Sequence, residues 1–589
     1  MRNPFRDYRQ LLERYLAPQL GAVLLMVTLL LASIALQLAG PQVARSFIDA
    51  IQAGANEESL IRAALLFIAV SLVQKAMSVL AAYWSERVAW TATNALRADL
   101  TTHLLKLDPG FHKAHTPGEL IERVDGDVNV LAGFFSSFVV QLLGSALLLI
   151  GVLVAVYWVD VRLGLAFTVF VLLAMVLLGQ VRQFGTQHWR QDRQHSAAFY
   201  GYVGEVLTAT EDIRSSGAEG HILRRFFDHL RDWWPARFKA DVWGQALMMA
   251  AIVAFAVGDA IAYGVGGSLY RQGAISLGAA YMVIAYTAML AAPLETIRVQ
   301  LQDLQQADAG IARVSELLET KSRLEDGADS VPAGALSVEF RAVRFAYEDG
   351  QNLNGNRREE QATILEDVSF RLDAGRVLGL LGRTGSGKTT MARLLFRLYD
   401  PQQGEVCLGG VNLRHAKLRE LRSRVGLVTQ EVQLFEASLR DNITFFDPNV
   451  SDERVLDALE TLGLGPWLER LPNGLDTPIS GVTLSAGETQ LVALARVLLR
   501  DPGLIILDEA SSRLDPATER MLEQAWSKLL EGRTAVIIAH RLSTVERADD
   551  ILILEHGRVV EHGPRHRLAA DPQSRFAALR RAGLEEVLV

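Results

Sequence analysis

Residues 377–395 read Val-Leu-Gly-Leu-Leu-Gly-Arg-Thr-Gly-Ser-Gly-Lys-Thr-Thr-Met-Ala-Arg-Leu-Leu, and the order of residue types in this segment indicates how the second half of the chain folds. The apolar run 377–381 predicts a buried strand, and a helical pattern follows from Met391. Between them, the spacing G-x-x-x-x-G-K-[ST] from Gly382 to Thr389 is typical of a phosphate-binding loop. An ordinary glycine-rich turn is the alternative. We favour the phosphate-binding loop because a strand precedes it and a helix follows it.

The residue types in this loop suit a nucleotide triphosphate and its metal ion. Glycines let backbone N–H groups close around phosphates, and the start of a helix favours negative charge. Lys388 would reach the β and γ oxygens, and the Thr389 hydroxyl would ligate Mg²⁺. The predicted ligands are therefore a nucleoside triphosphate and Mg²⁺, with these loop residues in contact with the nucleotide: Gly382, Arg383, Thr384, Gly385, Ser386, Gly387, Lys388, Thr389 and Thr390.

Length and composition predict two dissimilar parts. A chain of 589 residues is too long for one hydrophobic core. Half of the residues are hydrophobic and the mean hydropathy is +0.17, yet the formal net charge is −8. This balance gives no sign of a nucleic-acid partner. The single cysteine, Cys407, excludes an intramolecular disulfide. The basic residues are mostly arginine, which favours a bacterial origin.

The first half contains apolar segments long enough to cross a bilayer as helices, which takes about 20 residues. There are six of them, at about 19–40, 62–84, 134–158, 162–182, 243–268 and 277–300. Buried helices of a soluble protein are the alternative, which the number and length of the segments disfavour. The basic segment 1–18 resembles the start of a signal peptide, but no cleavage site is evident. We expect it to form an interfacial helix on the membrane.

Lysine and arginine predict the orientation in the membrane. The connections 85–133 and 183–242 are rich in them, whereas the other links are short and nearly free of them. We therefore expect the N-terminus and both long connections to be cytoplasmic. Helical spacing continues into these connections, and turn residues interrupt it near 108–118 and 213–220. Short helices at these breaks are predicted to touch a cytosolic domain.

Two ionisable residues lie inside predicted spans, Lys75 and Asp259. A charge at mid-membrane costs at least about 2.5 kcal/mol, so a functional role is considered for each of these residues. Pairing with each other or with water and a role in substrate binding are both consistent with the sequence.

A polar segment separates the two halves. We expect a transmembrane domain over residues 1–321, a linker over 322–333 and a nucleotide-binding domain over 334–589. Strands are expected within 335–347, and a polar loop at 351–361 reads as an insertion without chemistry of its own. The predicted fold class is multidomain: an all-α six-helix transmembrane domain followed by an α/β P-loop nucleotide-binding domain.

The second half resembles the nucleotide-binding domains of ABC transporters. Its motifs follow in the family's order: an aromatic residue, Tyr347; a loop glutamine, Gln430; a signature, 484–490; an apolar strand ending in Asp508 and Glu509; a D-loop, 512–515; and a switch histidine, His540. The resemblance implies that Tyr347 stacks on adenine, that Gln430 senses Mg²⁺ and faces the membrane domain, and that Ser485, Gly487 and Asp515 contact nucleotide.

Three of these residues also have a task that elementary chemistry explains. Asp508 ends a buried strand, so its carboxylate can hold Mg²⁺ together with Thr389 and Gln430. Glu509 would polarise the hydrolytic water, and His540 would bond the γ-phosphate. Lys388, Glu509 and His540 are therefore the predicted catalytic residues.

The signature departs from the pattern Leu-Ser-Gly-Gly-Gln that is usual in the family. Ala486 replaces a glycine and Glu488 replaces the glutamine, and the preceding segment 477–481 is short and lacks a glutamate. A carboxylate next to a triphosphate is repulsive. In this family two nucleotide-binding domains join head to tail, so this signature would serve the partner's phosphate loop.

The whole chain resembles an exporter-type half-transporter, which implies ATP hydrolysis coupled to export by alternating access in the bacterial inner membrane. We expect a second half-transporter chain of different sequence as partner, with a homodimer as the alternative. An importer on the same fold and an ATP-gated channel or regulatory subunit are the rival functions. The sequence does not identify the substrate: a lipid, a peptide, a drug-like molecule and a siderophore all fit.

Overall fold

A computed structural model describes residues 11, 13–133, 141–347, 363–480, 483–508, 516–539 and 545–582. Its contacts divide the chain into two compact units. The helical unit comprises Met1–Leu105 and Gly118–Thr320, and the α/β unit comprises Lys106–Pro117 and Lys321–Val589. The short segment 106–117 therefore packs with the second half of the chain, although it lies within the first half of the sequence.

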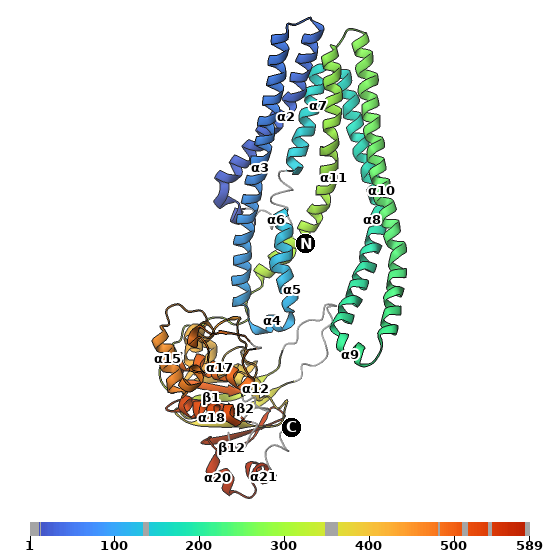
Figure 1. Ribbon diagram of the computed structural model, residues 1–589. Helices are drawn as coiled ribbons and strands as arrows, with labels where there is room; N and C mark the ends of the chain where they lie inside the picture. The colour runs from blue at the N-terminus through green and yellow to red at the C-terminus, as the bar shows by residue number, and fades with distance from the viewer. Residues whose placement is uncertain are drawn as a thin grey trace. The chain divides into compact units, whose positions relative to one another are not determined.

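Six long helices build the helical unit (Figure 1): α2 (Leu20–Gln52), α3 (Glu57–Lys106), α7 (Gly144–Val159), α8 (Val161–Thr208), α10 (Glu219–Arg271) and α11 (Leu277–Glu319). Among the described residues, five helices are long and apolar enough to cross a membrane: Ala17–Gln52, Glu57–Lys106, Gln141–Val159, Val161–Thr208 and Glu219–Arg271. The sixth predicted span falls on α11, whose apolar part, Leu277–Ala291, is shorter. Residues 134–140 of the third predicted span lie outside the described residues.

Several of these helices extend well past their apolar segments. The 53 residues of α10 make it about 80 Å long at ~1.5 Å per residue, whereas a hydrocarbon core is ~30 Å thick. α8 packs along α10, and α11 contacts α2, α7 and α10. Their shared core includes Phe167, Met282 and Tyr286, all fully buried. The long extensions expected beyond the spans are therefore present as continuous helices, and their cytoplasmic location stays a prediction.

The outer surface of the helical unit is apolar. Large side chains on it are strongly exposed, among them Leu24, Leu72, Val79 and Leu173. Of the predicted interfacial helix, residues 1–10 and 12 lie outside the described part. Its end is fixed to α3, because Arg14 and the Tyr15 hydroxyl both donate hydrogen bonds to Asp99, at 2.6 and 2.9 Å.

Short helices occupy both predicted breaks, which confirms that expectation. α4 (Pro109–Ala114) and α5 (Pro117–Ile121) follow α3, and α6 (Asp127–Gly133) comes next. α9 (Thr210–Ser215) joins α8 to α10, and Gly217 turns the chain there with a φ of 60°. α4 belongs to the α/β unit and contacts it, as predicted for the first break. That α9 docks on a nucleotide-binding domain stays a prediction.

The α/β unit contains a six-stranded sheet in the order β12-β11-β3-β10-β9-β6. Its strands are β3 (Val377–Leu381), β6 (Val425–Val428), β9 (Leu504–Asp508), β10 (Thr534–Ile538), β11 (Asp550–Glu555) and β12 (Arg558–Pro564). All neighbours are parallel except β11 and β12. Near-continuous apolar runs such as β9 and β10 are typical of parallel strands that are covered on both faces.

A second, antiparallel sheet has the order β2-β1-β4-β5. It consists of β1 (Val338–Phe345), β2 (Leu365–Leu372), β4 (Gln403–Leu408) and β5 (Val411–Asn412), and a small sheet pairs β7 (Ala437–Ser438) with β8 (Pro478–Ile479). Besides α4, the α-helices described in this unit are α12 (Lys388–Leu395), α13 (Leu418–Arg424), α14 (Leu439–Thr444), α15 (Asp452–Thr461), α16 (Gly465–Leu468), α17 (Ala486–Leu498), α18 (Pro516–Leu530), α20 (Arg565–Ala570) and α21 (Arg575–Ala582).

Candidate nucleotide-binding site

The register of the parallel sheet brings the predicted site together. Ile538 at the end of β10 pairs with Leu380 of β3 on one side and with Asp508 of β9 on the other. The carboxyl ends of these three strands therefore meet at one edge, where ligands bind in open α/β sheets. The phosphate loop follows β3 at this edge.

The glycines of the loop are required by the backbone. Gly382 has φ 151° and Gly387 has φ 107°, values that favour glycine. A Cβ at Gly382 would lie 2.2 Å from the Leu554 carbonyl oxygen, and one at Gly387 would lie 2.6 Å from Leu365 Cδ2. Gly387 also stands immediately before the first residue of α12. The loop therefore turns tightly into the N-terminus of a helix, the geometry that concentrates N–H donors on an anion.

Lys388 is held over the loop by backbone oxygens. Its Nζ donates to the carbonyls of Gly382 and Arg383, at 2.6 and 3.0 Å, and its side chain is almost fully buried. The pKa of Lys388 is lowered, because the effect of burial is larger than the opposing effect of the Asp508 carboxylate. The ammonium group is thus positioned to exchange these carbonyls for phosphate oxygens.

Ser386 supplies an independent sign that the loop suits an oxygen-rich ligand. Its Oγ is buried and has no hydrogen-bond partner among the described residues. A buried hydroxyl without a partner is costly, about 1–3 kcal/mol. A phosphate oxygen in the loop would satisfy it.

Two of the predicted metal ligands meet across the site. The Thr389 hydroxyl on α12 donates to Asp508 Oδ2 at the end of β9, at 3.4 Å. A hydroxyl and a carboxylate that converge in this way suit Mg²⁺, which takes few protein ligands and completes its shell with water and phosphate. Gln430 follows β6 and is exposed. In the described part of the chain, no hydrogen bond joins it to either of these two residues.

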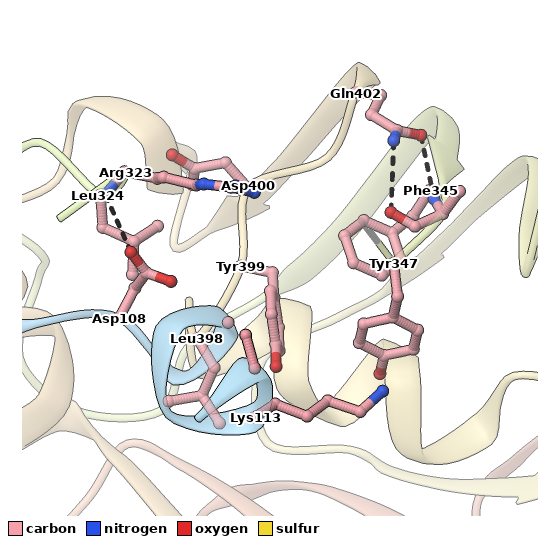
Figure 2. A pocket seen from close by; sticks show the side chains of 13 residues that line it. Asp108, Lys113, Arg323, Leu324, Phe345, Tyr347, Leu398, Tyr399, Asp400 and Gln402 are labelled. Atoms are coloured by element: carbon pink, nitrogen blue, oxygen red, sulfur yellow. Dashed lines mark hydrogen bonds between the residues drawn. The ribbon is translucent and has the colours of Figure 1, made fainter. Parts of the chain in front are cut away.

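Tyr347 lies at the end of the antiparallel sheet, close to α12. Its hydroxyl bonds Thr390 Oγ1 at 3.1 Å and accepts from Arg393 Nη1 at 3.0 Å. Figure 2 shows its ring at the wall of a cavity of about 270 Å³ that Tyr399 and Gln402 also line. The ring is therefore anchored at one end, as a platform for a stacked base needs to be.

Comparison with known proteins agrees with this geometry. Residues 23–294 match the ABC transporter transmembrane region, and residues 365–512 match the ABC transporter family model. The chain is 30% identical to an uncharacterised ABC transporter ATP-binding protein of Bacillus subtilis, YfiC, over 93% of this chain and 90% of that protein.

The chain belongs to the ABC transporter family. An ATP-dependent lipid A-core flippase of Chromohalobacter salexigens is 30% identical to it, over 98% of both chains. A bacterial Atm1-family ABC exporter solved with ATP bound superimposes with a TM-score of 0.78, at 26% identity, over 97% of this chain and 99% of that chain. The transporter is an ATP-hydrolysing exporter, and it carries the membrane region and the ATP-binding domain in one chain, as half-transporters do.

The signature of this transporter is built around a hydrogen-bonded turn. Ser485 caps α17: its Oγ accepts from the Glu488 N–H at 3.3 Å, and the Glu488 carboxylate accepts from the Ser485 N–H at 2.9 Å. The same carboxylate accepts from Ser485 Oγ at 2.8 Å and from Trp467 Nε1 at 3.1 Å. Glu488, expected from the sequence only as a repulsive charge, thus holds the start of this helix. The spacing Ser-x-x-Glu is the capping-box pattern, so this role could have been predicted.

Some predicted residues lie outside the described part of the chain. These are Glu509, Asp515 and His540, together with the insertion 351–361. Asp508 and Ala539, their described neighbours, end at the same edge of the sheet. Gly487, in the first turn of α17, is buried, and Thr384 and Gly385 lie in the phosphate loop.

Sequence reasoning missed three residues that contact residues of the predicted nucleotide-binding and signature motifs: Lys113, Arg393 and Trp467. Arg393 donates to Tyr347, Trp467 donates to Glu488, and Lys113 lies over the Tyr347 ring. Apart from the capping-box spacing, no local pattern points to these contacts.

The two intramembrane residues singled out from the sequence lie apart. Lys75 on α3 is exposed and Asp259 on α10 is half-buried, and the described residues contain no ion pair between them.

Proposed function

We propose that this half-transporter holds Mg²⁺ through Thr389 and Asp508, binds ATP through the loop 382–390, and hydrolyses it with Glu509 as general base. The observation that carries the proposal is the 3.4 Å hydrogen bond between the Thr389 hydroxyl and Asp508 Oδ2, beside the buried Lys388. Mg²⁺ would neutralise charge on the phosphates. General-base help from Glu509 would contribute roughly 10²–10⁴-fold.

The test of the metal site compares Asp508, which ends β9, with Asp501, which lies three residues before β9 begins. Asp508→Asn should lower Mg²⁺-dependent ATPase at least about 100-fold, because it removes a charged ligand. Asp501→Asn is the matched control, since Asp501 lies before the other end of the strand and pairs with Arg533 in solvent. Wild-type dependence of ATPase on Mg²⁺ concentration in Asp508→Asn would refute the metal site.

The proposed setting is the inner membrane of a bacterium, with the N-terminus and both hairpin tips in the cytoplasm. The exposed apolar side chains of α2 and α3 support contact with lipid. Lysine and arginine are more frequent in the two long connections than in the short links, which supports this orientation. Lys75 and Asp259 are the candidates for contact with the substrate inside the membrane.

The proposed partner is a second half-transporter of different sequence. The departures in the signature support this, because the Ser485 hydroxyl donates to Glu488 and would have to leave it to bond a phosphate of the partner site. Charge-assisted bonds of this kind are roughly twice as strong as neutral ones. A homodimer, with two such signatures, is the alternative.

The direction of transport distinguishes an exporter from an importer built on the same fold. In inside-out vesicles an exporter accumulates substrate when ATP is added, whereas an importer releases it. A channel or regulatory subunit would let solute equilibrate without accumulation. Accumulation that Glu509→Gln abolishes would identify pumping by this chain.

A further inference from the structure

The tip of the first hairpin, α4, is fixed within the α/β unit by one buried carboxylate, that of Asp108. Asp108 Oδ1 accepts from the Phe111 N–H at 3.2 Å and caps α4. Its Oδ2 accepts from the Arg323 N–H at 3.0 Å, as Figure 2 shows. Asp108 therefore connects the first turn of α4 to the segment that leads into β1. These two hydrogen bonds fix the position of α4 within the α/β unit.

From this position Lys113 reaches the ring of Tyr347 (Figure 2). Its Nζ lies over the ring, 4.8 Å from the centroid, within the ~6 Å at which a cation and an aromatic face attract each other. The Tyr347 hydroxyl is anchored to Thr390 and Arg393 of α12. The ammonium group of Lys113 thus covers one face of the ring that is expected to stack on adenine.

A stacked base and this ammonium group cannot share one face of the ring. Aromatic atoms in contact are about 3.5–4 Å apart, so a base fills the space beside the face on which it stacks. Lys113 is exposed and carries its ammonium group on a four-carbon stem with many rotamers, whereas the Tyr347 hydroxyl makes two hydrogen bonds. When the two compete, the lysine is the group that moves.

We propose that Lys113 competes with adenine for Tyr347, so that it sets the affinity for the base and reports base binding to the hairpin. The inference rests on the proposed binding of ATP and on the role of Tyr347 as the adenine platform, which the resemblance to ABC transporters implies. Binding free energies are reciprocal, so adenine weakens the Lys113 contact by the factor by which Lys113 weakens adenine binding. For an exposed cation over a ring, this factor is about 2–5-fold.

The experiment measures binding of two probes to the full-length chain in lipid nanodiscs by calorimetry with Mg²⁺ present. One probe is the non-hydrolysable ATP analogue with a β,γ-imido group, and the other is inorganic tripolyphosphate, which has no base. The ratio of their Kd values, tripolyphosphate over analogue, isolates the contribution of the nucleoside from that of phosphate charge. Lys113→Met should raise this ratio about 2–5-fold. Lys113→Arg keeps a cation and should retain the wild-type ratio, as should Lys106→Met, which removes an exposed charge in the same segment.

An unchanged or lower ratio in Lys113→Met would overturn the competition. Tyr347→Ala separates this failure from failure of the platform itself, because it should lower the ratio. If Tyr347→Ala leaves the ratio unchanged, the proposed adenine platform is wrong and the inference fails with it.

Hydrogen exchange on the wild-type chain gives a second readout that needs no variant. The analogue should speed exchange of the α4 amides relative to tripolyphosphate. Equal exchange with the two probes would contradict the proposal that base binding is reported to the hairpin.

Discussion

At the scale of single residues, the chemistry depends on the groups at the carboxyl edge of the sheet. Lys388 and Asp508 come from different elements, and the register of β3, β10 and β9 brings them to one place. The Lys388 ammonium group attracts the negative phosphates both in bound ATP and in the transition state. Glu509, next to Asp508 in the chain, is proposed to act only when water attacks.

This difference predicts distinct kinetic effects. Glu509→Gln should leave ATP binding intact and lower turnover at least about 100-fold, as loss of a general base does. Lys388→Ala should weaken ATP binding itself, because it removes the buried ammonium group. Binding and single-turnover assays on the same preparations separate the two effects. A normal rate of hydrolysis in Glu509→Gln would exclude it as the base.

Glu488 has a structural role that predicts a loss of stability. Glu488→Ala removes the acceptor for the Ser485 N–H and for the indole of the buried Trp467. Loss of a cap costs ~0.5–2 kcal/mol and an unpaired buried donor ~1–3 kcal/mol, so the midpoint of thermal unfolding of this domain should fall. Glu488→Gln is the matched control, since its amide oxygen can still accept from Ser485. Equal midpoints for wild type and Glu488→Ala would show that the capping box contributes little.

At the scale of elements, α4 is the part of the membrane region that the structure packs against the nucleotide-binding domain. Within it, Phe111 stacks on His115 with 4.3 Å between ring centroids. This contact braces the single turn that carries Lys113. The short helix is therefore held from both ends, by Asp108 at its start and by the stacked pair at its end.

Loosening α4 should uncouple transport from hydrolysis. Phe111→Ala removes the stacked pair, and we expect basal ATPase to persist while stimulation by transported compounds and transport itself decline. Lys106→Ala, in the same segment but exposed, serves as the control. Both activities are measured in proteoliposomes with any compound that stimulates the wild type. Full stimulation and transport in Phe111→Ala would remove this residue from the coupling path.

At the scale of the whole molecule, ABC half-transporters generally form dimers, and we propose that two chains together complete each ATP site. This chain offers a phosphate loop with an intact pattern and a signature whose serine hydroxyl already donates to Glu488. The two features would serve opposite composite sites. With a partner that has an ordinary signature, one site would be fully active and the other impaired.

The assembled transporter tests this asymmetry directly. In a heterodimer, Glu509→Gln in this chain should nearly abolish turnover, whereas Ser485→Arg should leave much of it, because only Glu509 would lie in the active site. In a homodimer both changes affect both sites. Equal, near-total loss from both changes, in a chain that is active when purified alone, would establish the homodimer.

The sequence by itself determined the elements whose signals are local. The glycine spacing of 382–389 between an apolar run and a helical pattern predicted β3, the loop and α12. The turn residues near 108–118 and 213–220 predicted the short helices α4 and α9. These predictions succeed because backbone conformation at glycine and proline, and the period of apolar residues, act over a few neighbouring residues.

Only the tertiary structure decided which distant side chains meet. Asp108 with Arg323, Lys113 with Tyr347, and Trp467 with Glu488 each join segments that no repeat or spacing relates. Such contacts depend on how whole elements pack and on which rotamers the packing leaves open. From the local sequence alone, a lysine on a short helix is simply expected to be exposed. That it lies over one particular tyrosine follows from the position of α4, which the buried carboxylate of Asp108 fixes.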